Sequence, residues 1–145
     1  MDPVVRALLA VLMRWIHISS VVTLIGGFIF ARYAVAPALA ALPEAERGMT
    51  TKRVIAGFRP LLYTVLVTIL GSGLYNYLTK PSYPPHYHIW IGLKFLFVLH
   101  IFAVAILYSQ REVDEAKRNR WLNGMVISGL IVIAISAYLR WISLA

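Results

Sequence analysis

Three ionisable side chains lie inside long apolar stretches of the sequence, and chemistry is expected from them first. They are His17, Lys94 and His100, and two arginines, Arg14 and Arg140, lie near the ends of such stretches. All six carboxylates lie outside the apolar stretches, so Lys94 must find another partner or lose its proton. This distribution argues against paired-carboxylate catalysis inside a membrane and against a carboxylate-driven proton pump.

Two histidines on different apolar stretches, without acidic neighbours, favour a haem or metal site. Haem b fits best, because its propionates would neutralise Arg14 and Arg140. A plainer interpretation is that His17 and His100 are polar residues hydrogen-bonded between helices. Two interpretations are also open for Lys94, which either extends its ammonium to the membrane surface or serves a bound anionic or metal-containing ligand.

Depth along the expected helices brings these groups together. At about 1.5 Å per residue from the inner cations, His17 lies about 22 Å, Lys94 about 25 Å and His100 about 16 Å above the inner surface. Gly71 and Gly73 lie at about 18 and 21 Å, where they allow a flat ligand or another helix to approach the backbone. Depth favours Lys94 as the partner of His17, whereas a neutral imidazole, ready to ligate, favours His100.

A separate pair of histidines, His86 and His88, follows two prolines in the segment His-Tyr-His. Residues two apart can hold copper or zinc together only in an extended segment, and a third ligand is needed. A copper or zinc site is therefore one interpretation, and two ordinary loop residues are the other.

The elements that must position these residues follow from composition. Of the 145 residues, 60% are hydrophobic and only 14% charged, against about 25% charged in soluble domains. A chain of this length could not hide so much apolar surface in water, and it is too hydrophobic for disorder.

The absence of cysteine excludes disulfides, Cys-ligated zinc, iron–sulfur clusters and thiol nucleophiles. The net charge of +8 fits basic loops beside an anionic leaflet rather than a nucleic-acid site.

Charged residues divide the chain into four apolar runs, each close to the length of about 20 residues that spans a bilayer. No run alternates as a membrane β-strand does. The sequence therefore predicts an all-α, integral membrane four-helix bundle that forms a single transmembrane domain over residues 1–145, with helices at about 7–36, 60–79, 89–110 and 121–142. Pro60 is expected in the first turn of the second helix, Pro37 and Pro43 at the end of the first, and residues 80–88 in a Pro-rich turn.

The cations beside the runs predict an orientation. Nine of them belong to the two long loops and four to the other side, namely Arg32, Arg47, Lys52, Arg53, Arg59, Arg111, Lys117, Arg118 and Arg120 against Arg6, Arg14, Lys80 and Arg140. We therefore expect the long loops in the cytoplasm of a bacterium, the chain in its inner membrane, and both termini outside the cytoplasm.

Four short segments also occur in a characteristic order. They are Trp15-Ile-His17 with Gly26-Gly27 and Arg32, then Pro60 with Gly71 and Gly73-Leu74, then Trp90-Ile-Gly-Leu-Lys94-Phe-Leu-Phe-Val98, and finally Arg120-Trp-Leu-Asn123. In these segments the chain resembles the HemJ-type, haem-associated protoporphyrinogen oxidases and the wider CopD-like group of small four-helix membrane proteins. The resemblance covers nearly the whole chain and implies b-type haem and a redox role. It also implies that His17 and Lys94 are the key functional residues.

One principal function and two alternatives are expected. The principal function is that of a haem b-binding membrane redox protein, and the resemblance implies oxidation of protoporphyrinogen IX with electrons passed to a quinone or oxygen. The alternatives are a CopD-like copper-handling protein and a non-catalytic membrane assembly subunit. The expected partners are the lipid bilayer and a porphyrin or quinone, without nucleic acid, and assembly as a homo-oligomer stays open.

Overall fold

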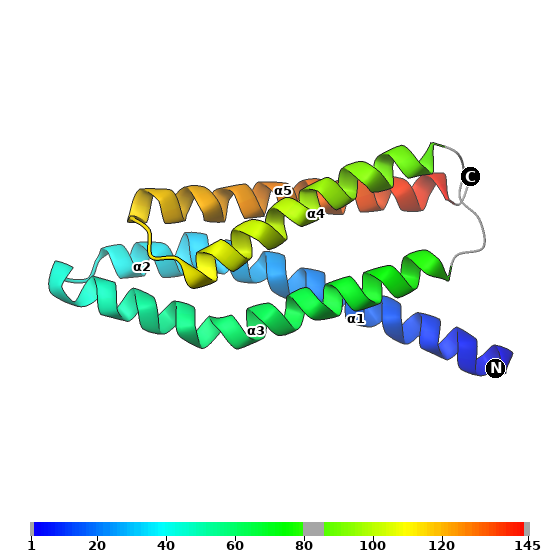
Figure 1. The fold of residues 1–145 in the computed structure, drawn as a ribbon, viewed down its shortest axis with the longest axis horizontal. Helices are drawn as coiled ribbons and strands as arrows, with labels where there is room; N and C mark the ends of the chain where they lie inside the picture. The colour runs from blue at the N-terminus through cyan, green and yellow to red at the C-terminus, as the bar shows by residue number, and fades with distance from the viewer. Residues whose placement is uncertain (1, 80–85, 144–145) are drawn as a thin grey trace.

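The computed structural model describes residues 2–79 and 86–143, whose helices form four long runs (Figure 1). These described residues contain no strand. The predicted all-α four-helix bundle is therefore confirmed. Each run is long and apolar enough to cross a membrane, and the chain is accordingly an integral membrane protein.

The first helical run is longer at both ends than the predicted helix at 7–36. It consists of α1 (Pro3–Phe30), the π-helical turn η1 (Ala31–Val35) and α2 (Ala36–Ala40). Its start is capped by Asp2, whose carboxylate accepts a hydrogen bond from the backbone N–H of Val4 at 2.8 Å.

Pro37 does not end the first run, contrary to the prediction. It lies in the first turn of α2, directly after the wide turn η1. In η1 the N–H of Ala36 reaches back to the carbonyl of Ala31, so the backbone has already left the α-helical pattern before the proline ring must be accommodated. The run ends at Ala40, and Pro43 directly precedes the next helix.

The second run is a single helix, α3 (Glu44–Leu78), which begins well before the predicted helix at 60–79. Pro60 therefore lies inside α3 rather than in its first turn, which corrects the prediction. The proline ring removes one backbone hydrogen bond and crowds the preceding turn, and this accounts for the bend of α3 seen in Figure 1.

α3 is also longer than a bilayer requires. Its 35 residues extend over about 52 Å, whereas the hydrocarbon core of a bilayer is about 30 Å thick. The sequence predicts a loop before Pro60, where Arg47, Lys52, Arg53 and Arg59 lie. It is instead a charged helical extension of the spanning segment.

The last two runs are α4 (Tyr87–Gln110) and α5 (Glu115–Ile142). α4 agrees closely with the predicted helix, whereas α5 begins earlier because Asp114 caps it, accepting a hydrogen bond from the Lys117 N–H at 2.7 Å. Most of the predicted Pro-rich turn, residues 80–85, lies outside the described residues.

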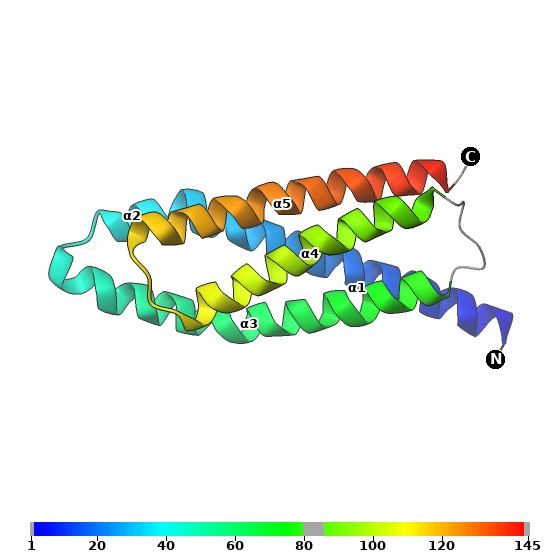
Figure 2. The ribbon, with the colours of Figure 1, turned by 45° about the horizontal axis from the view of Figure 1, so that its top comes forward.

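The helices pack as two antiparallel pairs. α1 packs along α3 and α4 packs along α5, while α3 and α4 touch much less. Figures 1 and 2 both show α4 beside α3 near the α4–α5 connection and moving away from it toward the opposite end. The pairs also meet between α1 and α5, where a Cβ on Gly129 would lie only 2.9 Å from the Cγ1 of Ile25. The absence of a side chain at Gly129 permits this close approach.

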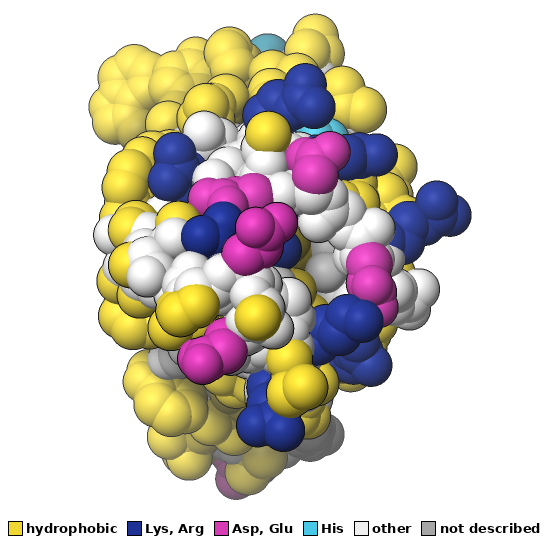
Figure 3. All heavy atoms as spheres, turned by 90° about the vertical axis from the view of Figure 1, so that its left-hand side faces the viewer, with side chains coloured by type: hydrophobic (Ala, Val, Ile, Leu, Met, Phe, Trp, Pro, Cys, Tyr) yellow, Lys and Arg dark blue, Asp and Glu magenta, His cyan; other side chains and the backbone are white. Residues whose placement is uncertain are grey.

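Charged side chains gather at one end of the bundle, which we call the charged end (Figure 3). It comprises the α2–α3 turn, the first half of α3 and the connection between α4 and α5, and it holds five of the six carboxylates, Glu44, Glu46, Glu112, Asp114 and Glu115. The end that contains the N-terminus and the start of α4 is called the opposite end. That the charged end faces the cytoplasm remains a prediction from its cations.

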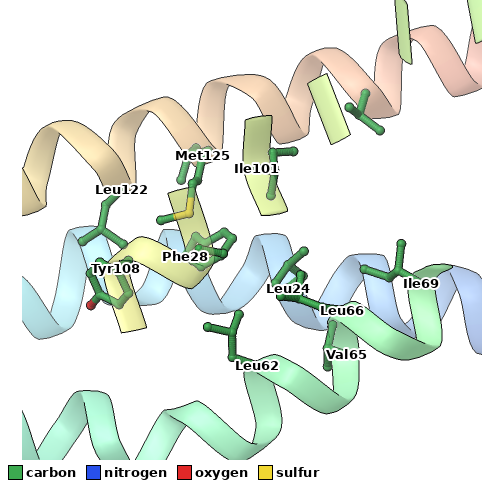
Figure 4. Close-up of a cluster of buried hydrophobic side chains, with 13 residues drawn as sticks. Leu24, Phe28, Leu62, Val65, Leu66, Ile69, Ile101, Tyr108, Leu122 and Met125 are labelled. Atoms are coloured by element: carbon green, nitrogen blue, oxygen red, sulfur yellow. The ribbon is translucent and has the colours of Figure 1, made fainter. Parts of the chain in front are cut away.

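The main buried core lies between the charged end and the middle of the bundle. Its largest fully buried side chains are Phe28, Leu62, Leu122 and Met125 from α1, α3 and α5. Ile101 of α4 packs into the same cluster (Figure 4). Many other large apolar side chains on the same helices are exposed, as contact with lipid requires.

Candidate functional site

His17 is held against α3 by a hydrogen bond with Ser72, a residue whose role is not evident from the sequence. The Nδ1 atom of His17 lies 3.0 Å from the Oγ atom of Ser72, whose exposed fraction is 3%. The Ser72 hydroxyl donates its proton to the carbonyl of Thr68 in the preceding turn. With the Ser72 proton on this carbonyl, Ser72 accepts the hydrogen bond from His17, and the neutral imidazole then carries its proton on Nδ1. In that tautomer the lone pair of the ring resides on Nε2.

Further polar contacts continue this hydrogen bond along the α1–α3 interface. The hydroxyl oxygens of Ser20 and Thr68 lie 2.8 Å apart, one turn nearer the charged end. On the other side of His17, the amide of Asn76 donates to the carbonyl of Met13 at 3.5 Å. Hydrogen bonds between membrane helices are worth about 0.6–2 kcal/mol each. This row of contacts therefore fixes the register of α1 on α3.

Gly71 and Gly73, which the sequence predicts to admit a flat ligand or another helix, have different surroundings. A Cβ on Gly73 would lie 3.0 Å from the Cε1 and 3.4 Å from the Nδ1 of His17. A Cβ on Gly71 would meet nothing within 4 Å, and Gly71 is exposed. Gly73 therefore makes room for the His17 imidazole itself, whereas Gly71, two residues earlier on the helix, points about 200° away from it and lies on the exposed surface of α3.

Lys94 of α4 is half-buried, and its charge interacts electrostatically with the His17 ring. Both ion pairs found in the described part of the chain lie at the charged end, and neither involves Lys94. The fold thus brings His17 and Lys94 into one neighbourhood from two different helix pairs. A lysine without an acidic partner in such a place is available to an anionic or metal-containing ligand.

His100 lies against α5 rather than α1. Its Nδ1 lies 3.0 Å from the Oγ of Ser128, and a Cβ on Gly124 would lie 3.7 Å from its Cε1. Its side chain is otherwise exposed on the surface of the bundle. His17 and His100 therefore contact different helices.

Arg14 and Arg140 are both exposed toward the opposite end. Arg140 lies in the last turn of α5, and Arg14 precedes His17 by about one turn on α1. Neither forms an ion pair with any of the described carboxylates. Both guanidinium groups are therefore accessible to an anionic group such as a propionate.

His86 and His88 lack the backbone geometry that the copper or zinc hypothesis requires. His86 has helical angles, φ −71° and ψ −14°, and His88 lies in the first turn of α4. On a helix, residues two apart point about 200° away from each other. No group of three or more His, Asp or Glu side chains that could hold a metal ion occurs in the described ranges.

Ser72 and Ser128 are the candidate functional residues that sequence reasoning missed. A signal for Ser72 exists, because it lies between Gly71 and Gly73 at the expected depth of His17. Without the register of α1 on α3, however, a serine in a membrane helix is equally well explained by a bond to its own preceding turn.

Comparisons of the chain with protein-family models, with curated proteins and with solved structures find no match. The function is therefore inferred from the fold and from the contacts around His17.

Proposed function

We propose that the chain is a haem b-binding membrane redox protein in which His17 would ligate the iron. The main support is the hydrogen bond between His17 and Ser72, which fixes the ring and, in the tautomer that carries its proton on Nδ1, leaves Nε2 to ligate the iron. Histidines that bind metals usually donate their second ring nitrogen to a fixed acceptor in this way, and imidazole is a common axial ligand of haem. The donor set around His17 therefore fits haem.

Lys94 is the proposed second ligand, and His100 is the alternative. Lys94 lies within electrostatic reach of His17, and its flexible stem tolerates a mismatch in depth. His100 is engaged by Ser128 on another face of the bundle, so it would have to leave this contact to approach His17.

The remaining candidate residues would hold and orient the haem. Arg14 and Arg140 are exposed cations suited to its propionates. Haem, when bound, supplies one-electron redox chemistry, while the protein sets ligation, orientation and access. Oxidation of protoporphyrinogen IX, with a quinone or oxygen as acceptor, is the narrower proposal and rests on the resemblance to the HemJ-type family.

Absorption spectra of the detergent-purified protein, oxidised and reduced, together with metal analysis, test this function. We expect a sharp Soret band in the wild-type protein and its loss in His17→Ala. Lys94→Met should shift the low-spin spectrum, because a thioether replaces an amine. His100→Ala should leave the ligation spectrum largely unchanged, and His88→Ala is the control for removal of a histidine outside the site.

A colourless protein, purified from cells with ample haem, would overturn the assignment and favour the non-catalytic assembly subunit. If His100→Ala gives a five-coordinate spectrum and Lys94→Met does not, the second ligand is His100. Circular dichroism of His17→Ala distinguishes loss of the ligand from loss of the fold.

A further inference from the structure

A pocket of about 540 Å³ opens at the charged end, between the first half of α3 and the connection from α4 to α5. Three carboxylates and five cations line it, the cations being Arg47, Lys52, Arg59, Arg111 and Arg118. Arg47 pairs with Glu115 at 3.7 Å and Lys52 with Glu112 at 2.9 Å. The charged lining residues outside these two pairs are three cations, Arg59, Arg111 and Arg118, and one carboxylate, Glu44, so the pocket carries a net positive charge.

One of the remaining cations is held in place by the fold. The Nη2 atom of Arg59 donates to the carbonyl of Ser109 at 2.6 Å, and the hydroxyls of Tyr63 and Ser109 lie 3.0 Å apart. These bonds tie α3 to the end of α4 at one wall of the pocket. A guanidinium has five N–H donors, so Arg59 keeps donors for a ligand in addition to the one that Ser109 accepts.

Two polar atoms at the pocket lack hydrogen-bond partners among the described residues. They are the Oγ1 of Thr51, whose exposed fraction is 7%, and the Nε of Arg47. Both residues line the pocket. Buried polar atoms without partners are uncommon in native proteins and point to a missing ligand or water.

The pocket also lies where α3 and α4 leave their apolar segments, which is the level expected for lipid headgroups. Arg59 immediately precedes the apolar segment of α3, and Ser109 lies one residue from the end of α4. Cations at this level next to a spanning helix attract anionic lipids.

We propose that this pocket binds a phosphate group, supplied either by the headgroup of an anionic phospholipid or by a soluble phosphate entering from the water. Planar guanidinium groups bind phosphate through paired N–H donors. Arg59 belongs to α3 and Arg118 to α5, so a phosphate between them bridges the two helix pairs. This site is independent of the proposed haem function.

The test titrates dihexanoyl-phosphatidylglycerol and inorganic phosphate separately into the full-length protein in maltoside micelles, with dihexanoyl-phosphatidylcholine as the neutral comparison. Calorimetry measures binding to the wild-type protein and to the double variant Arg59→Gln/Arg118→Gln. The matched control is Arg53→Gln/Arg120→Gln, which removes two exposed cations from the same helices outside the pocket.

We expect the pocket variant to weaken binding about tenfold or more, because charge-assisted hydrogen bonds are lost, and the control to bind almost as the wild type does. Binding of phosphatidylglycerol alone identifies a lipid, and binding of inorganic phosphate identifies a soluble ligand. Absence of both from the wild type, equal loss in both double variants, or equal binding of phosphatidylcholine would overturn the inference. The single variant Arg118→Gln, which keeps the Arg59–Ser109 bond, serves if the double variant does not fold.

Discussion

Alanine substitutions at Gly71 and Gly73 measure how tightly His17 is held, because they add the same methyl group two residues apart on α3. At Gly73 the new Cβ would lie 3.0 Å from the Cε1 of His17, closer than the 3.4–4 Å of ordinary contact. The ring cannot simply rotate away, since its Nδ1 is bonded to Ser72. Overpacking of this kind costs about 1–3 kcal/mol, while alanine in place of glycine returns up to about 1 kcal/mol of helix stability.

We therefore expect Gly73→Ala to lower the free energy of unfolding by about 0–3 kcal/mol. Gly71→Ala should leave it unchanged or raise it by up to about 1 kcal/mol, because its Cβ meets nothing within 4 Å. The difference between the two variants, about 1–3 kcal/mol, isolates the contact with His17.

The assay is reversible unfolding of the purified protein in mixed sodium dodecyl sulfate and maltoside micelles, followed by circular dichroism. Haem retention provides a second measurement, which Gly73→Ala should reduce and Gly71→Ala should not. If the two variants unfold within about 0.5 kcal/mol of each other, the His17 ring is not confined by Gly73 and the reasoning fails.

Two further predictions concern orientation and the exposed cations. A reporter that is active only outside the cytoplasm should be active when it is fused after Ala145, because the cations favour a cytoplasmic charged end. The control is a fusion of the same reporter in the α4–α5 connection. Activity of a cytoplasmic reporter after Ala145 would reject the orientation. The double variant Arg14→Gln/Arg140→Gln should lose bound haem more readily while its unfolding stays unchanged, since charge-assisted bonds to a propionate are worth about 1.5–3 kcal/mol and both arginines are exposed. Unchanged retention in a dialysis competition with apomyoglobin would show that these arginines do not bind the group.

The number and type of the helices could be predicted because the physics that sets them is local. Twenty uncharged residues between Arg59 and Lys80 suffice to predict a spanning helix. The boundaries of the helices were harder to predict than their number, because a charged segment in water can form either a loop or a helix. Residues 44–59 belong to α3, which continues through Pro60. Proline is common in the first turn of a helix, so Pro60 predicted the start of a helix rather than its interior.

The candidate site was predictable in its residues but not in its contacts. His17 and Lys94 stand out from the sequence because ionisable groups are costly in lipid. Which way His100 points depends on the rotation of α4, and a difference of one residue in packing turns a helix by about 100°. The same limit concealed Ser72, whose importance requires the register of α1 on α3.

The arrangement in two pairs gives this chain a natural order of assembly. α1 and α3 are neighbours along the chain, as are α4 and α5, so most of the packing is between consecutive segments. Contacts that are local in sequence form fastest, and membrane helices insert before they associate. Each hairpin can therefore close as it leaves the ribosome, and the Gly129–Ile25 contact belongs to a later step in which two finished hairpins dock. Because His17 and Lys94 come from different hairpins, the ligand neighbourhood is completed only by that docking.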